Sequence, residues 1–226
     1  MIYLFLVEAA LQLVPKELWG ERSVQADAER RGRRPDQFLL DVSIHYDAMV
    51  KHGGVGKRGR PDILHLSLLT ALDSPLNQMG YLKTYIHTLE DIVISIDPKT
   101  RLPRSYPRFE GLMVQLLREG HVPPKPPYFL EVLEEDLETL LERVEAKRKI
   151  VFSRSGRLTD PRRIFSKESI EEGVSLLIGA FQRGSISEEI LSLADEVISI
   201  SRFPLSTHLT VSRVLAEIEW LLEWGG

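Results

Sequence analysis

Cysteine is absent from the sequence, and this excludes disulfide bonds, thiolate metal sites and a cysteine nucleophile. The sequence also lacks a Walker phosphate-binding loop and a GxGxxG signature, which argues against ordinary nucleotide hydrolysis and dinucleotide binding. No HExxH or similar histidine spacing occurs, so we predict no metal site. A Ser-His-Asp triad cannot be inferred, because the members of such triads are not close in sequence.

Long hydrophobic runs are absent as well. No stretch approaches the length that a bilayer-spanning helix needs. The apolar run at 1–14 is interrupted by Glu8 and has no basic leader, so we interpret it as a first strand and turn rather than a signal peptide. We therefore expect a cytoplasmic protein with no membrane partner.

The composition is that of a folded globular chain. Of the 226 residues, 43% are hydrophobic and 27% are charged, which suits one domain with a sizeable core, and we predict a single domain over residues 1–226. The formal net charge is −4, so the molecule as a whole is not a basic nucleic-acid binder. Contacts with nucleic acid would have to come from local clusters of cations.

Short apolar runs alternate with helical apolar patterns through the second half of the chain. This favours an α/β fold with a mostly parallel sheet that has helices on both faces. The expected strands lie at 2–7, 38–44, 81–88, 91–96 and 149–152, with two more at the start of segments 176–184 and 197–206. The expected helices lie at 46–51, 63–72, 109–117, 133–144, 164–172, 187–193 and 207–223, with Ser206 as the N-cap of the last one.

The segments 176–184 and 197–206 form the candidate centre of a site. Each begins with an apolar run that predicts a buried strand and then breaks into a loop, and ligands of open α/β sheets bind outside the carboxyl ends of strands. Gly179 and Gly184 lack a Cβ, so the backbone there can turn sharply and approach a bound molecule closely. The pattern fits a small-molecule cleft; the alternative is two core strands followed by ordinary turns.

Cations gather in two loop-like segments, at 52–62 and 97–108, which are rich in glycine or proline. Guanidinium groups match phosphate geometry bidentately, and single-stranded RNA is commonly bound by such groups together with stacking rings, which Tyr106 and Phe109 could supply. We therefore interpret both segments as RNA-binding loops. The alternative is that these cations form ion pairs with the acidic helix at 131–145. The arginines concerned are Arg58, Arg60, Arg101, Arg104 and Arg108.

Arg60, Pro61 and Asp62 form a more specific pattern. A carboxylate at a helix start can hold the nearby arginine in one rotamer, and a fixed arginine can recognise one base or phosphate. The alternative is that Asp62 interacts only with the helix dipole. For a general base, the nearest candidates are Asp41 and Asp62.

Several long motifs resemble the NEP/EMG family of ribosome-biogenesis methyltransferases, from about residue 38 to the C-terminus. These motifs are far more specific than a pair of glycines. Tyr46 departs from the family, which tends to have a second histidine there, and we assign that position no role. The motifs are 60–65 (RPDILH), 68–77 (LLTALDSPLN), 101–104 (RLPR), 108–113 (RFEGLM), 178–181 (IGAF) with Gly184, and 200–201 with 204–206.

The resemblance implies a SPOUT-class fold with a family-specific insertion, in which the C-terminal part, about 149–226, is threaded as a trefoil knot and binds the cofactor. It implies S-adenosylmethionine as cofactor and a homodimer. The implied reaction is methylation of N1 of a pseudouridine in small-subunit ribosomal RNA, with a role in small ribosomal subunit biogenesis and a small-subunit ribosomal protein as a further partner. Because the chain has no long N-terminal extension, it resembles the compact archaeal form.

The matching motifs also imply the residues of the site. Asp62 would steady Arg60, and this pair is our candidate for the catalytic residues, with Arg60 stabilising charge that develops on the base. The residues implied to bind the cofactor are Gly179, Gly184, Ile198, Ser199, Ile200, Ser201, Arg202 and Phe203. The residues implied to contact RNA are Arg60, Arg101, Arg104 and Arg108.

Two other functions stay open at this point. One is a non-catalytic assembly factor that clamps ribosomal RNA or a ribosomal protein and keeps the cofactor pocket as a relic. The other is a small-molecule-binding α/β domain with incidental basic loops, whose RNA affinity would be insensitive to salt. The methyltransferase hypothesis predicts that the glycine loops and the arginines converge on one pocket, either within one chain or across a two-fold axis.

Overall fold

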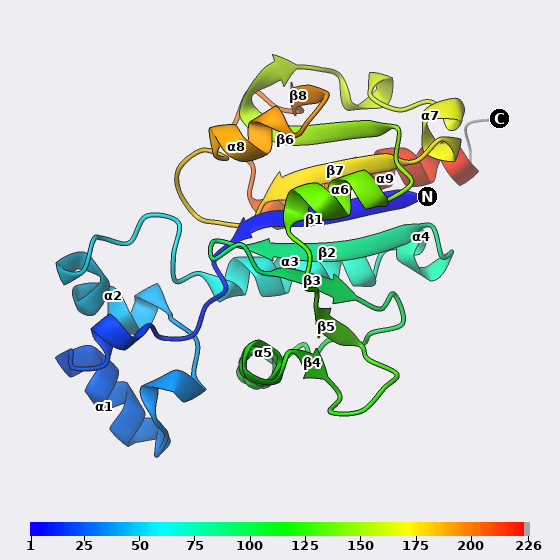
Figure 1. The fold of residues 1–226 in the computed structure, drawn as a ribbon. Helices are drawn as coiled ribbons and strands as arrows, with labels where there is room; N and C mark the ends of the chain where they lie inside the picture. The colour runs from blue at the N-terminus through cyan, green and yellow to red at the C-terminus, as the bar shows by residue number, and fades with distance from the viewer. Residues whose placement is uncertain (224–226) are drawn as a thin grey trace.

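A mixed eight-stranded sheet forms the centre of the computed structural model, which describes residues 1–223 (Figure 1). Along the sheet the strands follow the order β4-β5-β3-β2-β1-β7-β6-β8. The pairs β1–β2, β1–β7, β6–β7 and β6–β8 are parallel, and the pairs β2–β3, β3–β5 and β4–β5 are antiparallel. The strands are β1 (Ile2–Ala9), β2 (Leu82–Thr88), β3 (Val93–Ile96), β4 (His121–Val122), β5 (Leu130–Val132), β6 (Arg148–Leu158), β7 (Val174–Gly179) and β8 (Glu196–Ser199).

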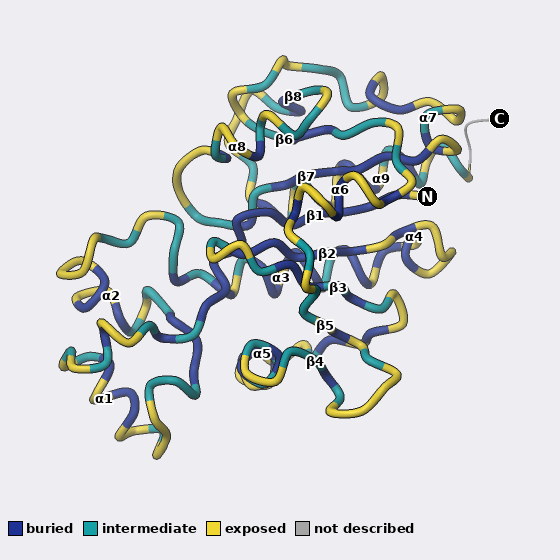
Figure 2. Tube along the Cα trace, in the orientation of Figure 1, coloured by how far each residue is buried: buried dark blue, intermediate teal, exposed yellow. Residues whose placement is uncertain are grey.

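β1 is a central strand, and all eight of its residues are buried. A parallel strand that is buried on both faces is expected to be almost continuously apolar, as IYLFLVEA is. Successive side chains of a strand point to opposite faces of the sheet. Leu4 and Leu6 therefore belong to one apolar core, and Phe5 and Val7 to another on the opposite face. Figure 2 shows the buried central strands, with exposed residues gathered on the outer helices and loops.

The helices of residues 1–223 cover both faces of this sheet, apart from two that form a lobe beside it. They are α1 (Arg22–Arg31), α2 (Val42–Lys51), α3 (Pro61–Leu72), α4 (Pro75–Gln78), α5 (Tyr106–Glu119), α6 (Leu137–Arg143), α7 (Lys167–Glu171), α8 (Glu188–Ser192) and α9 (Thr207–Glu223), with 3-10 turns at Lys16–Leu18, Pro35–Gln37 and Pro161–Arg163. α3, α5 and α9 share the core of Leu4 and Leu6, whereas α6 and α8 share the core of Phe5 and Val7. The predicted α/β fold, with a mostly parallel sheet and helices on both faces, is thereby confirmed. The trefoil knot stays a prediction.

α1 and α2 form a separate lobe at the edge of the molecule, drawn in blue in Figure 1. The lobe has a small apolar core of its own, which includes Phe38 and Met49. A partly buried ion pair ties the lobe to α5, because Arg31 Nη1 lies 2.8 Å from Glu110 Oε1. Within α1, Arg31 Nε lies 2.8 Å from Asp27 Oδ2, which holds the arginine in place. The lobe is thus fixed to the rest of the molecule by charge as well as by its chain connections.

The predicted strand at 38–44 is wrong. Only an isolated bridge forms in this stretch, and α2 begins at Val42. The Asp41 side chain caps the helix by accepting a hydrogen bond from Ser43 N at 2.8 Å. The apolar run here fills the core of the lobe and not a sheet, and α2 is consequently longer than the expected helix at 46–51.

Other expected helices are present with different ends. α6 is shorter than the expected 133–144, because Asp136 caps its start by accepting a hydrogen bond from Thr139 N at 2.8 Å. α7 is shorter than the expected 164–172 for the same reason, with Ser166 as the cap. In both helices the capping side chain, and not the first residue of the apolar pattern, marks where the helix begins.

β6 is longer than the expected run at 149–152. Phe152 and Arg157 both pair with Ile198, so the strand contains a bulge at 153–156. The expected strand ended before residues 153–156, but the chain returns to the ladder beyond this bulge.

α9 has the expected bounds, 207–223. Thr210 N donates to the Ser206 carbonyl at 3.0 Å, which places Ser206 at the N-cap position, as predicted. Residues 224–226, which belong to the predicted single domain and to its knotted part, lie outside the described residues. Across residues 1–223, none of the helices combines the length and the apolar character that crossing a bilayer requires.

Candidate active site

A cleft of about 730 Å³ opens at the carboxyl ends of β7 and β8, beside the bulge of β6. Its lining residues come from within the segments 60–66, 152–155, 178–186 and 198–210. Parallel strands carry their carboxyl ends to the same edge of a sheet, and this is why segments so far apart in sequence meet here.

Most of the residues expected to bind the cofactor lie in the wall of this cleft. Arg202 is the exception, since it is exposed and does not line the cleft. The expected residues that do line it are Gly179, Gly184, Ile198, Ser199, Ile200, Ser201 and Phe203.

Hydrogen bonds within and between neighbouring segments fix the loops that surround the cleft. Ser199 Oγ donates to the Ser201 carbonyl at 2.9 Å, and Phe203 N donates to Ser201 Oγ at 3.0 Å. At the start of α9, Thr207 Oγ1 donates to the carbonyl of Gly179, the last residue of β7, at 2.8 Å. The cleft wall is therefore shaped by the chain itself, as a preorganised ligand site requires.

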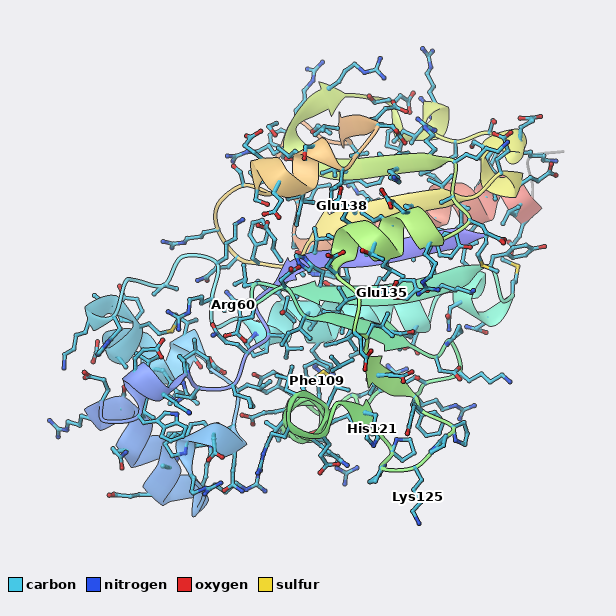
Figure 3. The ribbon with its side chains drawn as sticks, viewed as in Figure 1. Arg60, Phe109, His121, Lys125, Glu135 and Glu138 are labelled. Carbon is cyan, nitrogen blue, oxygen red and sulfur yellow. The ribbon has the colours of Figure 1, made fainter. Side chains whose placement is uncertain are left out.

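Arg60 stands at the start of α3 and lines the cleft (Figure 3). Asp62 accepts two hydrogen bonds from it, Nε to Oδ1 and Nη2 to Oδ2, both at 2.7 Å. Arg60 Nη1 donates to Gln182 Oε1 at 3.1 Å. A guanidinium has five N–H groups, so among residues 1–223 two of them have no acceptor and remain for a ligand.

The charge of Arg60 is secure. Its hydrogen bonds to Asp62 raise the pKa of Arg60, an effect that partial burial opposes and that the charges of Asp62 and Asp41 reinforce. Since Arg60 donates to both oxygens of Asp62, the carboxylate is placed to orient the guanidinium.

Asp41, the other candidate for a general base, does not line the cleft. Its Oδ1 accepts hydrogen bonds from Ser43, and its Oδ2 lies 3.5 Å from the Tyr106 hydroxyl. Burial raises the pKa of Tyr106, and the charge of Asp41 adds to this effect, so the hydroxyl stays protonated. We therefore assign Asp41 a structural role at the start of α2.

The remaining arginines expected to contact RNA lie outside the cleft lining. Arg101 and Arg108 are exposed and have no ion-pair partner among residues 1–223, while Arg104 Nη2 lies 2.9 Å from Asp73 Oδ2. None of the three pairs with the acidic segment 131–145 in the described part of the chain, which removes the proposed alternative role for these cations. Arg58 points elsewhere as well, with its Nε donating to Gln12 at 2.9 Å.

The loop that carries Arg101 and Arg104 is fastened to the helices behind it. It is shorter than the predicted loop at 97–108, because α5 begins at Tyr106 and Arg108 lies in its first turn. His65 Nε2 lies 2.7 Å from the Pro103 carbonyl. Asn77 Nδ2 donates to the Pro98 carbonyl at 2.8 Å and to the Leu72 carbonyl at 2.9 Å. α3 and α4 thus hold the arginine loop in one conformation, and the same α3 carries Arg60 at its start.

Several cleft residues were missed from sequence. Arg154 lines the cleft from the bulge of β6, and Phe181, Gln182 and Arg183 line it from the loop after β7. The position of the loop between Gly179 and Gly184 was available as a signal, but nothing local shows that Gln182 meets Arg60, 122 residues earlier. Among residues 1–223, no group of metal-ligating side chains is gathered anywhere.

Comparisons with known proteins agree with this geometry. The family model "EMG1/NEP1 methyltransferase" matches residues 4–219. The chain is 46% identical over 223 residues to "Ribosomal RNA small subunit methyltransferase Nep1" of Staphylothermus marinus (97% of this chain, 96% of the relative). It is 38% identical over 222 residues to the protein of that name from Saccharolobus solfataricus (98% of each chain).

A solved structure is similar throughout the fold. The crystal structure of Archaeoglobus fulgidus Nep1 bound to S-adenosylhomocysteine matches with a TM-score of 0.86 and 35% identity, over 97% of each chain. The match of the family model over almost all described residues, and the identity to full-length relatives, lead to one assignment. The chain belongs to the EMG1/NEP1 methyltransferase family.

Proposed function

We propose that this protein transfers a methyl group from S-adenosylmethionine to N1 of a pseudouridine in small-subunit ribosomal RNA, as a step in small ribosomal subunit biogenesis. The observation that carries the proposal is the placement of Arg60, fixed by Asp62, in the same cleft as the loops after β7 and β8. The printed names of the relatives and the S-adenosylhomocysteine in the related structure support both the substrate class and the cofactor.

The lining of the cleft suits a nucleoside with a charged tail. Ile178, Ile198 and Ile200 offer apolar surface, while the serines and backbone groups of the loops offer donors and acceptors. When bound, the cofactor would supply an activated methyl group on a sulfonium. The bond from N1 to the methyl carbon would form as the bond from sulfur to that carbon breaks, leaving a neutral thioether, and the N1 proton would pass to solvent. The part of this chain is to hold both reactants in line, which by itself supplies much of a rate enhancement.

Arg60 has the position and charge to bind the target base. Its two free N–H groups can bind a carbonyl of the base and stabilise negative charge that develops on the ring as the N1 proton departs. A base has to leave its stack to reach such a cleft. The exposed Arg101 and Arg108, together with Arg104, would hold the phosphates of the RNA from which that base is drawn.

The test is methyl incorporation into an RNA hairpin with pseudouridine in its loop, compared with its uridine twin. We expect transfer to the pseudouridine hairpin only, since uridine has no free N1. Calorimetry with S-adenosylmethionine runs beside it. Cofactor binding without transfer to any RNA, or no heat at high cofactor concentration, would favour the non-catalytic assembly factor.

We also propose a homodimer. α3 and α9 lie next to one another and expose Leu66 and Leu209, while Phe203 is exposed at the cleft. These apolar side chains form a surface that a second copy could cover. Sedimentation equilibrium should give twice the chain mass for the wild type, and Leu66→Glu should shift the mass towards the single chain.

A small-subunit ribosomal protein is a further proposed partner. Acidic side chains gather on and before α6, where Figure 3 labels Glu135 and Glu138, and such a surface attracts a basic protein. Calorimetric titration with purified small-subunit ribosomal proteins at low and high salt tests this. The cytoplasmic location stays a prediction.

A further inference from the structure

A second hollow, of about 540 Å³, lies directly beside the cleft. We call it the α2 groove. One side comes from α2, through Val42, Tyr46 and Val50, and the other from residues 55–57 and the segment 182–184. Its size falls within the range of small-molecule sites, about 300–1,000 Å³.

The α2 groove and the cleft share a wall. Gln182, Arg183 and Gly184 line both hollows, so this segment is a partition between them. A chain that places one unit in the cleft can therefore place the next unit in the groove by crossing the partition.

The partition is fixed from both ends. On the cleft side, Arg60 Nη1 donates to Gln182 Oε1 at 3.1 Å. On the groove side, Lys57 Nζ lies 4.6 Å from the centroid of the Phe181 ring and 2.7 Å from Glu8 Oε2. These contacts fix the shape of the groove, and the charge of Lys57 is already paired with that of Glu8.

The exposed groups of the groove have the chemistry of a nucleotide site. Tyr46 is 56% exposed and has no ring contact or hydrogen bond among residues 1–223, and Val50 beside it is 52% exposed. Arg183 is exposed and has no ion-pair partner in the described part of the chain. A free aromatic face together with an unpaired guanidinium is the combination with which proteins bind single-stranded RNA.

We propose that the α2 groove binds the nucleotide adjacent to the target base, with its base stacked on Tyr46 and its phosphate at Arg183. This inference rests on the proposed function and adds to it a second nucleotide subsite. It commits the RNA to a path across the partition 182–184, where Arg60 holds the target base on one side and Tyr46 holds its neighbour on the other.

The test measures hairpin affinity by fluorescence anisotropy for Tyr46→Ala. We expect the Kd to rise about five- to 150-fold, the range that loss of one base–aromatic stack produces, and Tyr46→Trp to retain wild-type affinity. The matched control is Tyr81→Ala, which removes a tyrosine that is 44% exposed and precedes β2, at the opposite end of the strands from the cleft. The S-adenosylmethionine Kd should be the same for all of these variants.

A cycle with modified RNA identifies the stacked base. Two hairpins are used, one with an abasic residue before the pseudouridine and one with an abasic residue after it, and both should bind the wild-type protein more weakly. With one of the two hairpins, Tyr46→Ala should weaken binding no further, and this identifies the stacked base. Arg183→Gln should reduce the slope of log Kd against log salt by about 0.7, the share of one single-strand phosphate, while the exposed Arg118→Gln should leave the slope unchanged.

The outcomes separate the two proposals. If wild type transfers methyl groups and Tyr46→Ala binds the hairpin as Tyr81→Ala does, the subsite is overturned and the proposed function stands. If the Tyr46→Ala defect persists in full on both abasic hairpins, the stacking assignment is overturned too. If wild type binds RNA with the expected pattern but transfers no methyl group, the proposed function fails and the groove remains an RNA site.

Discussion

At the scale of single residues, Arg60 is held by two side chains that lie far apart in sequence, one close to it and one 122 residues later. Asp62, two residues further on, binds Nε and Nη2, and Gln182 binds Nη1. Paired hydrogen bonds to a carboxylate fix the plane of the guanidinium as well as its position. Its free N–H groups are thereby aimed before any ligand arrives.

Asp62→Asn should therefore disturb the reaction more than the fold. The amide has an acceptor at only one of its two terminal atoms, so it cannot keep the paired hydrogen bonds from Nε and Nη2. Hydrogen bonds to charged groups are worth about 1.5–3 kcal/mol. We expect kcat/KM for the RNA to fall roughly ten- to 100-fold, measured by methyl incorporation.

Asp73→Asn is the control for this variant, because it breaks an arginine pair that is largely exposed on both sides, to Arg104. Exposed pairs contribute about 0–1 kcal/mol, so its kcat/KM should change by no more than about fivefold. Equal losses in the two variants would contradict the orienting role of Asp62.

The pairing of Arg60 with Asp62 could be predicted because it is local: the two residues flank a proline at a helix start. The contact with Gln182 could not, since it spans 122 positions and nothing nearby in sequence marks it. Similarly, Arg202 shares the run 198–203 with five predicted cofactor residues, but it is exposed and does not line the cleft. Sequence position selects the loop, and the turn of the backbone selects which side chains face inward.

At the scale of elements, the bulge in β6 brings two backbones unusually close. A Cβ added to Gly156 would lie 2.6 Å from Ile198 N and 2.6 Å from the carbonyl carbon of Val197. Both are main-chain atoms of β8, which cannot swing aside, and Ile198 lines the cleft. The glycine therefore permits the approach of the two strands that form one wall of the site.

Gly156→Ala should lower the free energy of unfolding by about 1–3 kcal/mol or more, as overpacking does, and should also weaken S-adenosylmethionine binding. Thermal unfolding and calorimetry measure the two effects. Gly111→Ala in α5 is the matched control, since its added Cβ would meet nothing within 4 Å. It should stabilise the protein by about 0.5–1 kcal/mol, and a similar gain at Gly156 would contradict the close approach.

The α1–α2 lobe carries a titratable group in its packing. His45 is fully buried, its Nδ1 accepts a hydrogen bond from Asp41 N at 3.1 Å, and its Nε2 lies 3.4 Å from Asp27 Oδ2. Burial lowers the pKa of His45 below its ordinary value of 6.5, although the charge of Asp27 opposes this. Folding therefore favours the neutral ring.

The sign of the pH effect follows from this. The unfolded chain takes up the proton first, so the contribution of His45 is present above pH 6.5 and is lost as the pH falls below it. We expect the loss of Tm between pH 7.5 and pH 5 to be smaller in His45→Gln than in the wild type. Equal losses by circular dichroism would contradict the role of the buried ring.

The same lobe shows where element prediction failed. The run at 38–44 is apolar and short, and it precedes a turn-like stretch, so periodicity alone favours a strand. The run instead packs into the small core of the lobe, and the cap at Asp41 begins α2 within it. The expected strands at 2–7, 81–88 and 91–96 did form, because each is buried in a sheet between covered faces.

At the scale of the whole molecule, the net charge of −4 conceals an uneven distribution. Acidic side chains collect around α6, while the cations of the RNA-binding proposal lie at the cleft, on the loop that α3 and α4 hold and in the first turn of α5. A molecule with this layout attracts RNA to one region and repels it from another.

The salt dependence of the RNA Kd measures how many phosphates this cationic region contacts. Arg101→Gln and Arg108→Gln should each reduce the slope of log Kd against log salt by about 0.7, because each removes one phosphate contact to a single strand. Arg162→Gln should leave the slope unchanged, since Arg162 is paired with Asp160 away from the cleft lining. Slopes that are the same in all three variants would contradict the phosphate contacts.

The place of β1 has a consequence for how the protein is made. Its residues pair with β2 on one edge and with β7, at 174–179, on the other. On a translating ribosome the first strand therefore waits, with half of its amide groups unpaired, until most of the chain has been synthesised. An unpaired apolar edge is a template for association between chains. Until β7 emerges from the exit tunnel, a nascent chain of this protein therefore exposes such an edge.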